Sequence, residues 1–254
     1  MATICCNGAV FNSIEAVIFD KDGTLANSEQ YLRTLAQRRA QLIDAQIPGV
    51  QEPLLLAFGL DSHCLQPTGL MAVGTRLENE IAAAAYIAET GCGWMEALEI
   101  ARSAFAEADV SLSHKARYTP LLAGAEDLLH RLRAVGIKIG LLSSDTLENV
   151  ETFVQHYQLS SLIQGYLGVH GPFLTKTSPG LIEHLLTVLE VSPQQTLMIG
   201  DALSDVQVAR QARLAGCVAM LGGWSTTITL PQADGFILSL QEIQVSSMFS
   251  SMFS

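Results

Sequence analysis

From residue 120 onward, the sequence alternates between short apolar runs and stretches with helical spacing. The apolar runs have the length of buried strands and lie at 137–142, 196–200, 217–221 and 235–238, with an earlier one at 16–19. The helical stretches lie at 146–157, 178–190 and 204–214. Such alternation implies parallel strands joined by helices, so we expect an α/β protein whose parallel sheet is covered by helices on both faces.

Residues 28–118 interrupt this alternation. Their apolar residues recur at helical spacing around 28–45, 82–88 and 94–105, and proline and glycine separate the stretches. We therefore predict a core formed by 1–27 and 119–254, and an inserted all-helical cap domain over 28–118. The last nine residues, SSMFSSMFS, repeat one tetrapeptide and are expected to form a frayed tail.

Charge and composition narrow the classes of partner. The formal net charge of −11 disfavours nucleic acid and anionic membrane surfaces. No apolar run approaches the roughly 18 residues of a membrane span, and the first residues lack the basic start of a signal peptide. The five cysteines show no metal-ligand spacing. We expect a cytoplasmic protein with reduced thiols. The sequence gives no indication of the oligomeric state.

Two acidic residues, Asp20 and Asp22, follow the first apolar run in the segment DKDGTL. Alternate residues of an extended segment point the same way, so both carboxylates can face one site. Gly23 then lets the backbone turn sharply. The alternative is a turn that carries two solvated acids. The apolar run before Asp20 favours a buried site, because desolvated acids need a partner or a function.

A second acidic pair, Asp201 and Asp205, lies in the segment GDALSD. A spacing of four places two carboxylates on one face of a helical turn, although Asp201 also suits a helix N-cap. Ligand sites in open parallel sheets lie beyond the carboxyl ends of the strands. Three or four acids gathered there repel one another unless a cation is present, and carboxylate oxygens suit Mg²⁺.

Hydroxyl and ammonium groups complete the set of candidates. Ser143 ends the run 137–142, where its hydroxyl can hold a phosphate oxygen. Ser144 is a second phosphate-binding candidate, but a structural role competes, because Asp145 and Glu148 have the spacing of a capping box. Lys176 precedes the helix expected at 178–190 and is one of only four lysines. A solvated surface lysine is the alternative, but an acidic site favours a bridging cation.

The segments DKDGTL, LLSSD, LTKTSP and MIGDALSD, in that order, resemble the four motifs of the haloacid dehalogenase superfamily. The resemblance spans residues 14–236. It implies a Rossmann-like core, and an insertion similar to the helical cap of the phosphoglycolate phosphatase and phosphomutase branch. The sequence departs from the usual pattern at Lys21, Ser144 and Thr177, of which Lys21 stands where an apolar residue is more usual.

The resemblance also implies residue roles. Asp20 would be the nucleophile, and Asp22 would protonate the leaving group and then activate water. Ser143 would bind the transferring phosphoryl group, and Lys176 would orient it. The implied Mg²⁺ ligands are Asp20, the backbone carbonyl of Asp22, Asp201 and, through water or by holding the other ligands, Asp205. Asp22 favours phosphoryl transfer over dehalogenation, because an alkoxide leaving group needs a proton and a halide does not.

The sequence therefore predicts a Mg²⁺-dependent phosphatase that hydrolyses a small phosphorylated metabolite through a phospho-aspartate. A phosphomutase acting on a sugar phosphate would use the same four motifs, and a non-catalytic binding module on this fold is a third possibility. Substrate contacts would come from the cap. The basic residues available there, each of which we expect to be a solvated surface charge, are Arg33, Arg38, Arg39, Arg76, Lys115 and Arg117.

Overall fold

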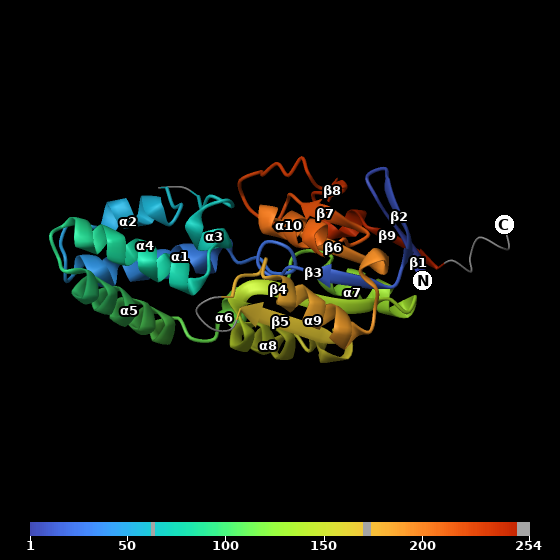
Figure 1. Cartoon of the computed structure of the whole chain (residues 1–254), viewed down its shortest axis with the longest axis horizontal. Coiled ribbons are helices and arrows are strands. Elements are labelled where there is room, and N and C mark those ends of the chain that lie inside the picture. Colours follow the sequence, from blue (N-terminus) through green and yellow to red (C-terminus); the bar gives the residue numbers. More distant parts are fainter. Residues whose placement is uncertain (62–63, 170–173, 248–254) are drawn as a thin grey trace. The chain divides into compact units, whose positions relative to one another are not determined.

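The computed structural model describes residues 1–61, 64–169 and 174–247 (Figure 1). Its internal contacts divide the chain into two compact units. The first unit consists of Met1–Asn27 and Pro120–Ser254, and the second is Ser28–Thr119. Within the described ranges, no helix is both long and apolar enough to cross a membrane.

The first unit is built on a six-stranded parallel sheet with the strand order β5-β4-β3-β6-β7-β8. The strands are β3 (Ala16–Phe19), β4 (Lys138–Thr146), β5 (Gly165–Val169), β6 (Thr196–Gly200), β7 (Gly216–Met220) and β8 (Gly235–Ile237). The predicted parallel sheet is confirmed. Strand β5 was not predicted, because it is an edge strand with two glycines and only two of its five residues are fully buried.

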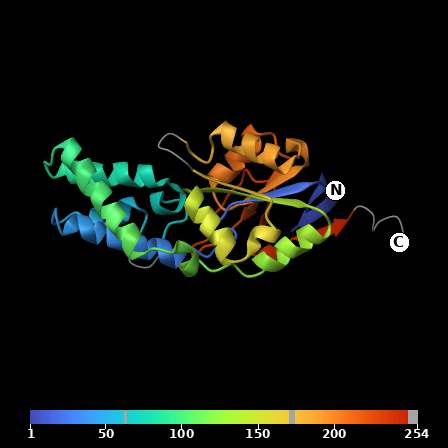
Figure 2. The same ribbon diagram turned by 90° about the horizontal axis from the view of Figure 1, so that it is seen from below.

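Helices cover both faces of this sheet, as predicted. Figure 2 shows α9 (Pro179–Leu189) and α10 (Leu203–Gln211), in orange, on one face of the sheet. The opposite face carries α7 (Ala125–Ala134) and α8 (Leu147–His156), in green and yellow. Leu185 and Val206, from the first pair of helices, pack with Ile18 and Met198 of the sheet in one buried apolar cluster. Burial of these side chains holds the central strands in place.

The register of the central strands sets the geometry of the site. Phe19, the last residue of β3, pairs with Leu141 of β4 on one side and with Ile199 of β6 on the other. The backbone N–H of Asp20 then donates to the carbonyl of Ile199 at 2.9 Å, which continues the ladder by one residue. The carboxyl ends of three neighbouring strands therefore meet at one edge of the sheet.

A second, antiparallel sheet has the order β2-β1-β9. Its strands are β1 (Ala2–Cys6), β2 (Ala9–Ile14) and β9 (Gln244–Ser247). The sheet thus pairs two strands that precede β3 with one that follows β8. Asn7 and Gly8 both have positive φ, which suits the two-residue turn between β1 and β2. The frayed-tail prediction is wrong for Ser246 and Ser247, which pair with β1. The rest of the repeat, 248–254, lies outside the described residues.

The second unit consists of helices in its described part, together with one isolated bridge between Leu60 and Leu65. Its helices are α1 (Glu29–Asp44), α2 (Gln51–Ala57), α3 (Leu70–Val73), α4 (Arg76–Glu89), α5 (Trp94–Ser111) and α6 (Lys115–Tyr118). Helix α4 begins with a capping box, in which the Thr75 hydroxyl accepts the Glu78 N–H and the Glu78 carboxylate accepts the Thr75 N–H.

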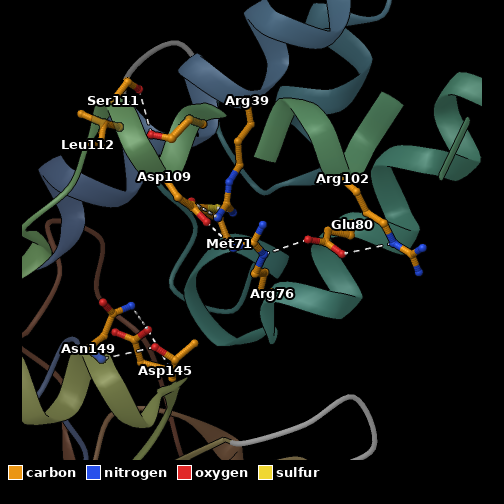
Figure 3. A network of polar contacts seen from close by, with 12 residues as sticks. Arg39, Met71, Arg76, Glu80, Arg102, Asp109, Ser111, Leu112, Asp145 and Asn149 are labelled. Carbon is orange, nitrogen blue, oxygen red and sulfur yellow. Dashed lines mark hydrogen bonds and ion pairs between the residues drawn. The ribbon is translucent and has the colours of Figure 1, made fainter. Parts of the chain in front are cut away.

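An ion-pair network inside this unit corrects one prediction. Arg39 is buried rather than solvated: its guanidinium donates to Asp109 Oδ1 at 3.0 Å and lies 4.1 Å from the ring centroid of Phe105. Arg76 links Asp109 to Glu80 (Figure 3). The cation–π contact and the ion pair offset the cost of desolvating Arg39. Apolar periodicity in the sequence does not reveal these contacts.

Candidate active site

The site begins at Asp20, which directly follows the fully buried strand β3. Asp20 is 8% exposed, and its Oδ1 lies 2.6 Å from Nζ of Lys176. Burial raises the pKa of Asp20 to about 6, because desolvation outweighs the attraction of the Lys176 ammonium and the Asp205 carboxylate adds repulsion. The charged form of Asp20 therefore depends on a nearby cation such as the Lys176 ammonium.

The loop after Asp20 is tightly folded back on itself. The carbonyl of Lys21 accepts the N–H groups of Leu25 and Ala26, both at 2.9 Å. Gly23 has φ +77°, and a Cβ there would lie 2.6 Å from Asp201 Oδ2 and 2.4 Å from the Trp224 indole nitrogen. Only glycine fits this position, as the sharp turn predicted from the sequence requires.

Both oxygens of Asp201 are held by neutral donors. Its Oδ1 accepts the Thr24 hydroxyl at 2.8 Å, and its Oδ2 accepts the Trp224 indole N–H at 2.7 Å. Burial raises the pKa of Asp201 well above its usual range, and the negative charges of Asp20 and Asp205 raise it further. Sequence reasoning missed Trp224, which lies in the loop after β7, where no motif marks it.

Asp205 lies in the first turn of α10, and its carboxylate is close to those of Asp20 and Asp201. Its Oδ2 accepts the N–H of Ala202 at 2.9 Å, and its Oδ1 lies 2.6 Å from Nζ of Lys176. The expected helical face shared by Asp201 and Asp205 is wrong, because α10 begins at Leu203 and Ala202 occupies the N-cap. The two carboxylates meet instead because Gly200 has no side chain: a Cβ there would lie 2.1 Å from Asp205 Cγ.

Lys176 bridges the nucleophile candidate and Asp205 and is only 3% exposed. Burial by itself would lower the pKa of this lysine, but the carboxylates of Asp20 and Asp205 outweigh burial, so its pKa lies above the ordinary value. The alternative of a solvated surface lysine therefore does not apply. Lys176 carries a fixed positive charge inside the cluster.

Asp20, Asp201 and Asp205 each offer one carboxylate oxygen to a common point: these three oxygens lie within 4.8 Å of one another, and all three residues are buried. One ammonium, that of Lys176, contacts this group of three acids. The donors are hard oxygens and the negative charge is in excess, so the cluster can hold a metal ion. Asp22 is not one of these three side chains.

Ser143 and Ser144 lie in β4, the strand next to β3 in the sheet. Ser143 is 2% exposed, and its Oγ accepts the Asp145 N–H at 3.1 Å. Ser144 follows and is half-buried. The predicted capping box of Asp145 and Glu148 is wrong, because Thr146 caps α8 by accepting the Asn149 N–H. Asp145 Oδ1 instead accepts the Asn149 side-chain amide at 2.8 Å (Figure 3).

Lys21 is the second buried lysine of the site, and sequence reasoning gave it no role. It is 1% exposed, with Nζ 2.6 Å from Asp22 Oδ1 and 3.1 Å from Asp145 Oδ2. The ammonium also lies 5.6 Å from the ring centroid of Phe153 on α8. Lys21 thus joins the DKDGTL loop to the last residues of β4, which include Ser143 and Asp145.

Comparison with known proteins identifies the family to which the chain belongs. Residues 14–213 match the family model of haloacid dehalogenase-like hydrolases. A phosphoglycolate phosphatase from Pseudomonas savastanoi pv. phaseolicola is 25% identical over 218 residues, which cover 82% of this chain and 70% of that protein. One from Synechococcus elongatus is 32% identical over 104 residues, or 41% of this chain and 46% of that protein. Several further alignments also span less than half of the relative.

Among solved structures, that of a predicted phosphoglycolate phosphatase from Haemophilus somnus 129PT superposes with a TM-score of 0.65 at 16% identity. The superposition covers 90% of this chain and 96% of that one, and it shows a shared fold. The family match covers more than half of the sequence and includes every residue of the site except Trp224. The chain therefore belongs to the haloacid dehalogenase-like hydrolases.

Proposed function

We propose that this hydrolase is a Mg²⁺-dependent phosphatase that cleaves a small phosphate monoester through a phospho-aspartate on Asp20. The observation that carries the proposal is the buried Asp20 carboxylate, 2.6 Å from Lys176 and clustered with Asp201 and Asp205. The names of the curated relatives described above support hydrolysis of a phosphate ester. A phosphomutase would use the same residues, but those relatives favour the hydrolase.

The acidic cluster fits Mg²⁺. Its side chains offer hard oxygen donors, and Lys176 alone does not balance the three carboxylates it lies among. We assign the ion to Asp20, the backbone carbonyl of Asp22, and Asp201, with Asp205 contributing through water or by holding the other ligands. A bound Mg²⁺ supplies positive charge that offsets repulsion between the nucleophile and the substrate phosphate.

The residues of the chain carry out two displacements at phosphorus. In the first, an oxygen of Asp20 forms the new P–O bond while the bond to the leaving group breaks, and Asp22 gives its proton to the departing alkoxide. In the second, Asp22 takes a proton from water, the water oxygen attacks the same phosphorus, and Asp20 is released as a carboxylate. Dividing the reaction makes each step easier, and the placed acid contributes about 10²–10⁴-fold.

Groups around Asp20 bind the phosphoryl oxygens during both displacements. We assign this role to Lys176, to the hydroxyl of Ser143 and to Ser144 beside it. The Lys176 ammonium and the Ser143 hydroxyl are both buried, so their positions are fixed before substrate arrives. Preorganised donors of this kind stabilise the charge that develops on the transferring group.

We further propose that residues 28–118 form a cap domain that selects the substrate. The helices of this stretch interrupt the alternating core in the chain, between the first motif and the second. The chemistry assigned above needs no side chain from this stretch. Substrate choice would then vary with the cap while the core residues stay the same.

The test is release of inorganic phosphate from p-nitrophenyl phosphate and from a panel of phosphorylated metabolites that includes 2-phosphoglycolate. Activity should require Mg²⁺ and disappear with a chelator. Asp20→Asn should lower turnover by at least about 10³-fold, because the amide cannot act as the nucleophile. Asp127→Asn is the matched control, since Asp127 is 70% exposed on α7 and should keep full activity. A folded Asp20→Asn variant that retains substantial turnover would refute the proposal.

A further inference from the structure

Lys21 is buried between two carboxylates that come from different parts of the chain. Its ammonium contacts Asp22 at 2.6 Å and Asp145 at 3.1 Å, and its side chain is 1% exposed. The two acids are also largely shielded, with side-chain exposures of 14% and 11%. Removing a charged ammonium from water costs several kcal/mol, so its burial requires partners such as these.

The same contacts connect two parts of the proposed machinery. Asp145 accepts from Thr146 and Asn149 through Oδ1, which fixes it to the start of α8. Its backbone N–H donates to the Ser143 hydroxyl at 3.1 Å. A continuous path therefore runs from Asp22 through Lys21 and Asp145 to Ser143.

An uncharged residue at position 21 would change this arrangement. The carboxylates of Asp22 and Asp145 contact one nitrogen and so lie near each other, and without the ammonium between them they would repel. Asp22 would then turn away from the position in which Lys21 now holds it. A displacement of about 1 Å in a reacting group can lower a rate by about 10²-fold.

We propose that Lys21 is a positioning residue for the leaving-group step: its ammonium holds the Asp22 carboxylate in place and ties it to the last residues of β4, where Ser143 lies. The proposal rests on the proposed function, in which Asp22 transfers the proton. Lys21 is assigned no contact with the substrate or with phosphorus. It acts through Asp22, so its effect should follow how much a substrate depends on that proton.

The experiment compares two substrates that share a phosphoryl group and differ in leaving group. p-Nitrophenyl phosphate releases a stabilised phenolate that needs little protonation, whereas an alkyl phosphate releases an alkoxide that needs the proton. Lys21→Met keeps an unbranched side chain that is only one atom shorter and removes its charge. We expect it to lower kcat/KM, which reports the first displacement and not the later hydrolysis in which Asp22 also acts, by about 10²-fold for the alkyl phosphate and by less than about 10-fold for p-nitrophenyl phosphate.

A double-mutant cycle assigns the effect to Asp22. Asp22→Asn should produce the same preference for the good leaving group. Adding Lys21→Met to Asp22→Asn should then change kcat/KM for the alkyl phosphate by less than about threefold, because the group that Lys21 positions is already lost. Lys138→Met is the matched control: it removes an ammonium that contacts the Leu189 carbonyl at 2.6 Å, at the other end of β4 from Ser143.

If Lys21→Met does not fold, Asp145→Asn tests the same path while leaving Lys21 and Asp22 in place. It should give a smaller loss with the same dependence on leaving group. An equal loss of kcat/KM for both substrates, or no loss in a folded variant, would overturn the proposal. Each of these outcomes differs from failure of the proposed function, in which the wild type itself would release no phosphate or Asp20→Asn would remain active.

Discussion

Replacing Trp224 by phenylalanine tests whether the indole prepares Asp201 for a cation. The substitution keeps an aromatic ring but removes the N–H that donates to Asp201 Oδ2 at 2.7 Å. Asp201 Oδ1 keeps its hydrogen bond from Thr24 at 2.8 Å, so the carboxylate loses one of two fixed donors. Trp224 is 7% exposed and Asp201 is 3% exposed, which leaves little room for solvent to replace the lost donor.

The size of the effect follows from the type of hydrogen bond. A hydrogen bond to a charged group contributes about 1.5–3 kcal/mol, which corresponds to roughly a 10–100-fold change in an equilibrium constant. The indole also opposes the rise in the pKa of Asp201 that burial causes, so the variant should hold a proton at this carboxylate more readily. Both effects weaken cation binding without removing a reacting group.

The assay is initial rate against Mg²⁺ concentration with p-nitrophenyl phosphate. Trp224→Phe should raise the half-saturating Mg²⁺ concentration by about 10–100-fold while the rate at saturation changes by less than about threefold. Trp94→Phe is the control, because Trp94 is 47% exposed on α5. Half-saturation of Trp224→Phe within twofold of the wild type would show that the indole does not prepare Asp201 for the ion.

Two further predictions concern burial away from the proposed chemistry. Asp109→Asn should lower the free energy of unfolding by about 2 kcal/mol, measured by urea denaturation, because it leaves the buried Arg39 guanidinium without that carboxylate. Arg39→Met should be less destabilising, since Asp109 keeps its ion pair with Arg76, and the reverse order would contradict this account. Cys6 is 2% exposed and burial raises its pKa to about 11, whereas Cys92 is half-buried, so Cys6 should react more slowly than Cys92 with a thiol reagent at pH 8; equal labelling, mapped by mass spectrometry, would contradict the buried geometry.

Strands buried on both faces were the easiest elements to predict. The boundaries of β3 and β6 match their predicted runs, because a central parallel strand is buried on both faces and is therefore mostly apolar. Helices at the surface were predicted with boundaries a few residues off, as for α10. Strand β5 and the antiparallel sheet were missed, because their half-exposed residues and glycines give no continuous apolar run.

Only the residues of the candidate site that local sequence patterns mark were predictable. Asp20 and Asp201 directly follow β3 and β6, and Ser143 lies in the neighbouring strand β4, two residues beyond the partner of Phe19, so the fold class alone suggests that they converge. The partners of Lys21 and Asp201 were not predictable, because Asp145 and Trp224 are brought in by contacts between distant loops. Single-residue patterns report periodicity and turns, whereas a buried ion pair depends on the finished packing.

The central position of β3 also determines when the site can form. Ala16 pairs with Lys138 on one side and with Thr196 on the other, so both neighbours of β3 are made long after it. At about 5–20 residues per second, the first of them leaves the ribosome roughly 6–24 s later. The helices of 28–119 make contacts within a short stretch of chain and form quickly. During synthesis, the apolar segment that precedes Asp20 therefore waits with both edges unpaired, and the nascent chain needs protection from aggregation until the last third has been translated.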